Sequence, residues 1–175
     1  IKMMSIGFLV DPNEAVVWRG PMAASALKQF MSDVEWDELD FLLYDMPPGT
    51  GDIQLTLTQS IPLTGSVIVT TPQEISLIDA RKGAKMFEKV NVPVLGIIEN
   101  MSYYTNSDGT KEHIFGEGGG KKLSEEMGIT FLGEIAINTA VRIGGDEGKP
   151  IVLGKPESTE AKQFVSIARD LAEQV

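Results

Sequence analysis

Residues 41–52 read Phe-Leu-Leu-Tyr-Asp-Met-Pro-Pro-Gly-Thr-Gly-Asp, an apolar run that ends in a carboxylate and enters a turn rich in proline and glycine. Short apolar runs bounded by turn residues are typical of strands buried on both faces of a parallel sheet. In such sheets, ligands bind at the carboxyl ends of the strands. The segment therefore predicts a strand over 41–44 that places Asp45 at the edge of the sheet where ligands bind.

Four further apolar runs have the length of strands. They lie at 6–10, 67–69, 94–98 and 131–135. Apolar residues at helical spacing occur between and after them, at about 21–34, 76–87, 118–128 and 158–173. This alternation predicts an α/β fold with a mostly parallel sheet, in one domain over 1–175. The polar segment 104–113 carries a Ser-Asp-Gly turn signal and predicts an exposed hairpin or loop.

The composition narrows the classes of partner. Fifteen basic and 25 acidic residues give a net charge of −10, which disfavours nucleic acid and anionic membrane surfaces. The absence of cysteine excludes disulfides, thiol nucleophiles and thiolate metal sites within this chain. No apolar run reaches the roughly 18–20 residues of a membrane span, and no signal peptide opens the chain, so we expect a cytoplasmic protein.

The turn after 41–44 could bind a phosphate with its metal ion. A carboxylate such as Asp45 can hold Mg²⁺ through water, because Mg²⁺ keeps much of its hydration shell. Gly49 would let a backbone N–H approach a terminal phosphate. The alternative is that Asp45 only caps the turn, and the pattern leaves both possibilities open. Asp52 fits a helix cap better than a catalytic role.

A second polar position follows the run at 94–98. Asn100 can donate and accept hydrogen bonds at once, which suits an adenine edge, although it also suits an ordinary turn. The glycines of 116–120 do not form a P-loop, because no Ser or Thr follows the lysines. We expect a helix entry or a dimer-contact loop there, a loop at 144–148, and an exposed His113.

Eight segments in order resemble the Mrp/ApbC proteins, a family of MinD-like P-loop ATPases with a deviant Walker A loop. They lie at 4–9, 18–21, 45–52, 71–74, 79–83, 99–102, 114–119 and 144–150. The resemblance implies a Rossmann-like P-loop NTPase fold that binds ATP and Mg²⁺. It also implies a homodimer that transfers a [4Fe–4S] cluster to an iron–sulfur apo-protein.

The resemblance assigns the phosphate end of the site to one turn. Asp45 matches the aspartate that lies near Mg²⁺ and holds it through water. Pro47, Pro48 and Gly49 match the turn that senses the γ-phosphate. Asp45 and Gly49 are thus the residues with catalytic roles by this likeness.

The resemblance assigns the base end to two strands. Asn100 matches the asparagine that binds adenine. Glu134, Ile135 and Ala136 match the segment that flanks adenine, where the family usually has proline in place of Ala136.

Two departures from the family pattern bear on activity. The P-loop and switch I are expected upstream of Ile1, so the chain is expected to be the C-terminal part of the ATPase domain and not to hydrolyse ATP alone. The Cys-x-x-Cys pair expected after Asn-Met-Ser-Tyr is replaced by residues 104–109, which offer no thiolate. Iron–sulfur clusters are held by thiolates, so this chain supplies no cluster ligand.

Three functions remain to be weighed. The favoured one is an ATP-binding ATPase like the iron–sulfur cluster carriers. The alternative is a MinD-like, ATP-dependent dimeric switch or scaffold without a cluster, which the missing cysteines favour. A remnant without activity is the least favoured, because Asp45, Gly49 and Asn100 are all present.

Overall fold

A computed structural model describes residues 1–11, 20–47, 49 and 51–175. Pro48, Thr50 and residues 18–19, which carried part of the predictions, lie outside the described residues. The chain divides into two compact units, Ile1–Pro62 and Leu63–Val175, and each is described by itself.

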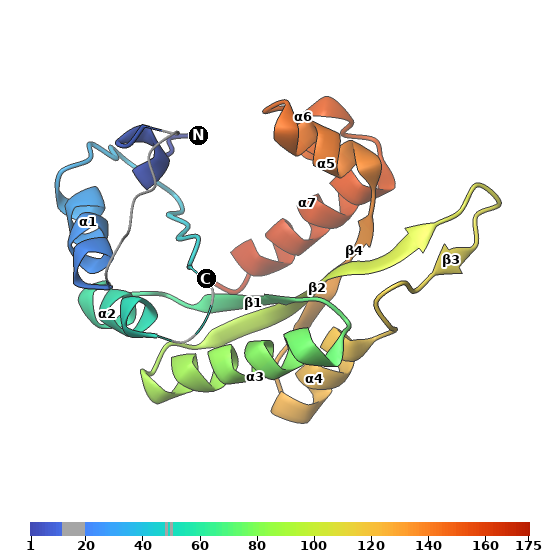
Figure 1. Cartoon of the computed structure of the whole chain (residues 1–175), viewed down its shortest axis with the longest axis horizontal. Coiled ribbons are helices and arrows are strands. Elements are labelled where there is room, and N and C mark those ends of the chain that lie inside the picture. The colour runs from blue at the N-terminus through green and yellow to red at the C-terminus, as the bar shows by residue number, and fades with distance from the viewer. Residues whose placement is uncertain (12–19, 48, 50) are drawn as a thin grey trace. The chain divides into compact units, whose positions relative to one another are not determined.

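The second unit is an α/β unit built on a mostly parallel sheet (Figure 1). Its strands are β1 (Ser66–Thr70), β2 (Val94–Thr105), β3 (Lys111–Glu112) and β4 (Phe131–Ile137). Its helices are α3 (Glu74–Lys89), α4 (Gly119–Met127), α5 (Thr139–Asp146), α6 (Ile151–Gly154) and α7 (Thr159–Ala172). Strand β2 lies between β1 and β4 and runs parallel to both. The α/β prediction with a parallel sheet is confirmed for this unit.

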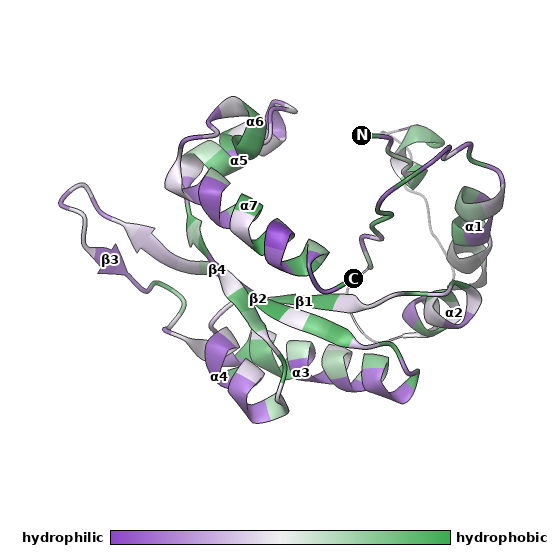
Figure 2. Ribbon diagram, turned by 180° about the vertical axis from the view of Figure 1, so that it is seen from behind, coloured by the Kyte–Doolittle hydropathy of each residue, from purple (hydrophilic) through white to green (hydrophobic). Residues whose placement is uncertain are grey.

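Helices cover both faces of this sheet. Helices α3 and α4 lie on one side and α7 packs against β4 on the other (Figure 1). A hydrophobic cluster under α7 joins Leu132 and Ile135 of β4 to Ile167 of α7. Figure 2 shows hydrophobic colour over most of β1 and part of β2, paler to hydrophilic colour where β2 leads into the hairpin, and hydrophilic colour on β3. The central strand is buried because its run Val-Leu-Gly-Ile-Ile has no polar position before Glu99.

The predicted helices are found, with changes at their ends. Helix α4 ends at Gly128, whose φ of 66° is the left-handed conformation of a helix stop. The Ser158 hydroxyl accepts the N–H of Ala161 and caps α7. Helix α3, however, begins at Glu74 and not at Ser76. The Ser76 hydroxyl accepts the N–H of Thr71, so it ties the helix to the end of β1.

Two predictions about burial and loops in this unit are wrong. The apolar residues at helical spacing in 158–173 were expected to share one buried face, but Phe164 and Ala168 among them are exposed, and Ala161 and Ile167 form the buried face. Residues 144–148 were expected to form a loop, yet α5 continues through Asp146. A Cβ on Gly144 would lie 2.5 Å from the carbonyl oxygen of Lys149. This glycine therefore serves a close approach of backbone within a helix.

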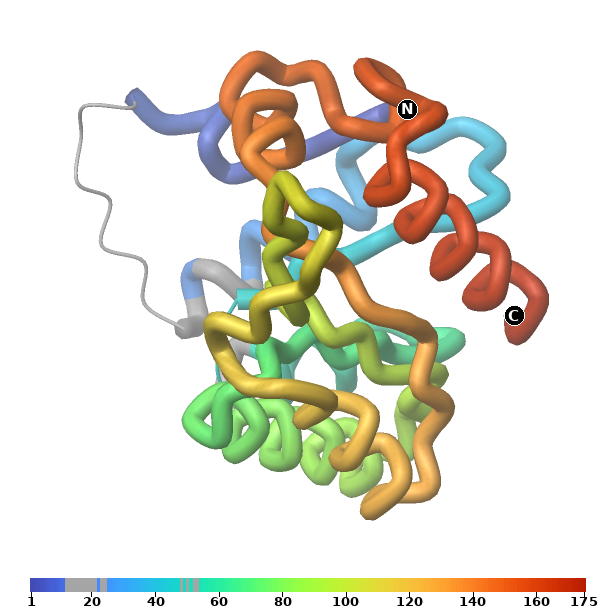
Figure 3. Tube along the Cα trace, turned by 90° about the vertical axis from the view of Figure 1, so that its right-hand side faces the viewer, coloured from blue at the N-terminus to red at the C-terminus, as the bar shows by residue number. Residues whose placement is uncertain are grey.

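The polar segment 104–113 forms the predicted hairpin. Tyr104 and Thr105 of β2 pair antiparallel with Glu112 and Lys111 of β3. The hairpin projects toward the viewer in Figure 3, in yellow. Thr110 donates from its N–H (2.9 Å) and its hydroxyl (2.6 Å) to Asp108, and these bonds hold the pKa of Asp108 below its ordinary value.

The first unit is helical in its described residues. A short 3₁₀ helix (Ile6–Phe8) precedes α1 (Gly20–Ser32) and α2 (Asp52–Ser60). The two strands predicted at 6–10 and 41–44 are not formed, and Leu43 is 90% exposed. A strand requires a neighbour for its backbone hydrogen bonds, and the described part of this unit contains no strand. The apolar pattern alone carries no information about such a partner.

No helix in the described part of either unit is long and apolar enough to cross a membrane.

The start of α4 predicts a sharp sensitivity to one methyl group. A Cβ on Gly119 would lie 2.4 Å from the carbonyl oxygen of Pro72, so Gly119→Ala must displace backbone. We expect a loss of about 1–3 kcal/mol in the free energy of unfolding, measured by urea denaturation. Gly145→Ala on α5, where a Cβ meets nothing within 4 Å, is the control and should leave stability equal or slightly higher. Equal losses in both variants would contradict the close contact.

Candidate functional site

The carboxyl ends of β1, β2 and β4 meet at one edge of the sheet, because the three strands are parallel. Asn100 of β2 is the register partner of Ile135, and Glu99 is the partner of Glu134. The predicted base-binding asparagine therefore lies beside the predicted base-flanking segment. The pairing of β2 with β4 brings these residues together although they are far apart in the sequence.

Strand β2 leaves its regular ladder directly after Asn100. From Asn100 to Tyr104 the strand advances four residues, while its partner advances two, from Ile135 to Ile137. Two extra residues are therefore accommodated in a bulge, and Met101 takes a left-handed backbone with φ of 56°. The Met101 N–H donates to Asn100 Oδ1 over 3.0 Å. The carboxamide thus takes part in local turn chemistry and stays at the strand end.

Residues 134–136, the predicted base-flanking segment, have one half-exposed side chain and two buried ones. Ile135 is 3% exposed and belongs to the cluster under α7, and Ala136 is 7% exposed. Any contact they make with a ligand therefore comes through their backbone. Glu134 keeps a half-exposed carboxylate that pairs with Lys111.

A buried carboxylate lies one residue before Asn100. Glu99 is 1% exposed, and its Oε2 accepts the N–H of Gly120 over 2.6 Å. The unpaired N–H groups and the dipole at the start of α4 stabilise a negative charge at this position. The glycine-rich segment 116–120 is therefore a helix entry, as one of the two sequence alternatives predicted. Its helix end is occupied by Glu99.

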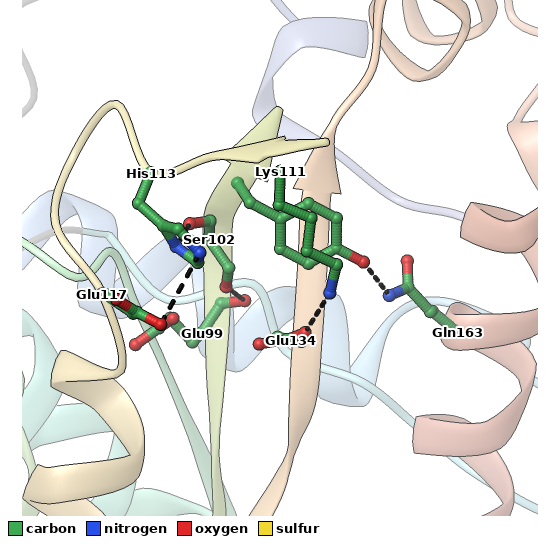
Figure 4. A network of polar contacts seen from close by, with 8 residues as sticks. Glu99, Ser102, Lys111, His113, Glu117, Glu134 and Gln163 are labelled. Carbon is green, nitrogen blue, oxygen red and sulfur yellow. Dashed lines mark hydrogen bonds and ion pairs between the residues drawn. The ribbon is translucent and has the colours of Figure 1, made fainter. Parts of the chain in front are cut away.

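A polar network joins the hairpin to β4 and α7 (Figure 4). Lys111 Nζ lies 3.6 Å from the centre of the Tyr103 ring and 3.3 Å from Glu134 Oε1. Gln163 Nε2 donates to the Tyr103 hydroxyl over 3.1 Å. Burial alone lowers the pKa of Lys111, but the hydrogen bond with Glu134 and the neighbouring Tyr103 outweigh it, and the pKa is raised.

The prediction that His113 is exposed is wrong, because its side chain is partly buried. Its Nδ1 lies 3.1 Å from the carbonyl oxygen of Ser102, and its side chain is 30% exposed. The carbonyl can only accept, so Nδ1 carries the proton in this contact. Glu117, on the far side of the ring, lies 3.8 Å from Nε2. The histidine thus fastens the chain after β3 to the bulge of β2.

The turn predicted to bind phosphate belongs to the unit Ile1–Pro62. Asp45 is exposed, and Gly49 is exposed with a φ of 96°, which a residue with a side chain rarely adopts. Gln54 of α2 is buried, and its Nε2 donates to the carbonyl oxygen of Pro47 over 2.9 Å. Gln54 therefore holds the start of the turn. Among the described residues, no group of three or more His, Cys, Asp or Glu side chains could hold a metal ion.

Reasoning from the sequence missed several residues of this edge. Glu99 carried a signal, because a carboxylate between Ile98 and Asn100 in an otherwise apolar strand must find a partner if it is buried. Lys111 and Gln163 carried none. They lie 8 and 60 residues from Tyr103 along the chain and meet it only in the folded unit.

A family model described as the NUBPL iron-transfer P-loop NTPase, within the ParA group, matches residues 1–172. The chain belongs to this family. An iron–sulfur cluster carrier protein of Synechocystis sp. is 52% identical over 177 residues, which cover all of this chain and 50% of that protein. The chain thus spans about half the length of the curated relatives that it matches.

Solved structures of nucleotide-binding proteins share the fold. The nucleotide-binding protein of Archaeoglobus fulgidus in complex with ADP superposes with a TM-score of 0.69 at 36% identity, over 82% of this chain and 58% of that one. The cell division ATPase MinD of Pyrococcus furiosus superposes with a TM-score of 0.65 at 26% identity, over 92% of this chain and 64% of that one. The P-loop NTPase fold class predicted from the sequence is confirmed by these likenesses.

The hydrogen bond of the buried Glu99 to the start of α4 can be tested by substitution. Glu99→Gln keeps the size of the side chain but removes the charge that faces the start of α4, and we expect a loss of about 1–2 kcal/mol in the free energy of unfolding. Urea denaturation at neutral pH measures it. The control is Glu117→Gln, the same change at an exposed position before the same helix, for which we expect less than about 0.5 kcal/mol. A tolerated Glu99→Gln would show that the charge is dispensable.

Proposed function

We propose that the protein containing this chain is an ATP-dependent iron–sulfur cluster carrier that acts as a homodimer in the cytoplasm. The family match and the names of its relatives support the class of function. The observation that carries the nucleotide part is the position of Asn100, which lies in β2 directly before its bulge, beside 134–136 and just beyond the last residue paired with β1. The ADP complex of the Archaeoglobus fulgidus protein supports a nucleotide as the ligand.

Each unit, taken by itself, offers residues whose chemistry suits one part of a nucleotide. Asn100 provides a carboxamide of the kind that pairs with an adenine edge. Asp45 provides an exposed carboxylate that would hold Mg²⁺ through water, and Gly49 provides a turn without a side chain. Pro47, and Pro48 outside the described residues, are the further residues proposed to lie at the γ-phosphate. When bound, Mg²⁺ neutralises charge that develops on the phosphates.

The cluster is the cargo in this proposal, and residues 1–175 do not fit its ligand chemistry. The chain has no cysteine, whereas clusters are held by thiolates. At 104–110, the hairpin tip is closed by hydrogen bonds of Asn106, Asp108 and Thr110. In this proposal the thiolates therefore come from outside residues 1–175. An iron–sulfur apo-protein would be the recipient.

The cysteine-free hairpin also supports a second candidate, a nucleotide-dependent dimeric switch that carries no cluster. The likeness to MinD is compatible with either function. Anaerobic reconstitution with iron and sulfide, on the gene product at its full natural length, separates the two. Visible cluster absorbance with stoichiometric iron and sulfide supports the carrier. ATP-dependent dimerisation without a cluster supports the switch. If neither a cluster nor ATP-dependent dimerisation is observed, both candidate functions are contradicted.

Asn100→Ala tests the base end. We expect the dissociation constant for ADP to rise about tenfold in calorimetry, because a base-edge pair of hydrogen bonds is lost. Asn106→Ala at the hairpin tip makes the same chemical change and should leave the affinity unaltered within a factor of about two. Equal affinities for both variants would remove Asn100 from the site.

Asp45→Asn tests the phosphate end. We expect Mg²⁺-dependent ATP hydrolysis by the full-length protein to fall about 10–100-fold, as for other groups that orient a metal's water ligands. Binding of ADP without Mg²⁺ should be unchanged. Asp40→Asn, an exposed carboxylate in the same segment, is the matched control. Undiminished hydrolysis by Asp45→Asn would place the metal elsewhere.

A further inference from the structure

We propose that Met101 is a positioning residue that sets base preference. Its left-handed backbone turns its N–H onto Asn100 Oδ1, fixes the orientation of the carboxamide, and so makes the site favour adenine over guanine. This inference rests on the proposed nucleotide function and adds a specificity-determining residue to it.

The backbone of Met101 is unusual for its residue type. Its φ of 56° is rare for residues other than glycine, asparagine and aspartate, and it occurs inside a strand. Such a conformation persists only where surrounding contacts hold it, and conformations of this kind gather at functional sites. The Met101 side chain is 42% exposed, so its packing does not explain the conformation.

Contacts on both flanks hold the bulge. Before it, the buried Glu99 is anchored to α4 through the N–H of Gly120. Across it, the buried Ser102 hydroxyl donates to the carbonyl oxygen of Glu99 over 3.0 Å and closes a turn around the two residues between. After it, Tyr103 is 5% exposed and held by Gln163. Asn100 and Met101 thus lie at the tip of the bulge, and the residues on both sides of them are held by hydrogen bonds.

The bulge decides which end of the carboxamide faces outward. The Met101 N–H can only donate, so the atom that meets it at 3.0 Å must be the oxygen of Asn100. Within the part of the chain that the structure describes, Asn100 Nδ2 donates to no protein group. A flipped carboxamide would set an NH₂ group against an N–H and lose this bond. The orientation is therefore fixed before a base arrives.

A fixed carboxamide distinguishes the two purines. Adenine presents an amino donor beside a ring nitrogen that accepts, and this pattern complements Oδ1, which keeps a second lone pair, together with Nδ2. Guanine presents a carbonyl oxygen where adenine has its amino group. That oxygen would face Oδ1, and both atoms are acceptors. Preference for adenine therefore depends on the bond from Met101.

The test compares substitutions that permit or oppose the left-handed backbone. Met101→Gly and Met101→Asn permit it, whereas the β-branched Met101→Val opposes it. Dissociation constants for ADP and GDP are measured by calorimetry on the gene product at its full natural length. We expect the wild type to prefer ADP at least about tenfold, Met101→Gly and Met101→Asn to keep that preference, and Met101→Val to bring the ratio toward one.

The outcomes separate this inference from the function on which it rests. If the wild type binds neither ADP nor GDP, the nucleotide function and the inference both fail. If the wild type prefers ADP and Met101→Val keeps the same ratio of dissociation constants, the role of Met101 fails while the nucleotide function stands. The role of Met101 also fails if all three variants lose the preference for ADP equally. Hydrogen exchange of the Met101 amide in the wild type tests the hydrogen bond from the Met101 N–H to Asn100 Oδ1. Exchange as fast as that of the amides at the hairpin tip would refute this bond.

Discussion

The carboxylate of Glu99 against the start of α4 is the interaction on which this edge of the sheet depends. A charge at 1% exposure is stable only with a strong partner, and the N–H of Gly120 at 2.6 Å belongs to a helix end that favours anions. The bond joins the central strand to the helix that covers it. A Cβ on Gly120 would lie 3.0 Å from Glu99, so the helix can approach this closely only with glycine there.

The irregular end of β2 follows from that anchor. With Glu99 held on one side and Tyr103 on the other, the chain between them must accommodate two residues more than β4 provides. The bulge places Asn100 beside 134–136 and sends β2 onward into the hairpin. Lys111 then returns over the Tyr103 ring to Glu134. One edge of the sheet thus connects Asn100 with the cysteine-free hairpin at 104–113.

The side chains of the hairpin tip differ in chemistry from those that hold iron–sulfur clusters. Asn100 has a carboxamide whose oxygen is held by the Met101 N–H, while the hairpin tip is closed by amide, hydroxyl and carboxylate groups. Residues 1–175 contain no cysteine, so they offer no thiolate to an iron–sulfur cluster. The chain spans about half the length of the curated relatives that it matches.

The sequence by itself determined the class of fold, the hairpin, the helices α4 and α7, and the starts of β2 and β4. These depend on local signals, namely apolar runs, glycine stops and capping hydroxyls, which act within a few residues. Only the tertiary structure decided that 6–10 and 41–44 form no strands, that Glu99 is buried, that Met101 is left-handed, and that Lys111 meets Glu134. Each of these depends on a partner far away in sequence, since a ladder, a buried charge and a bulge are all defined by the element packed against them.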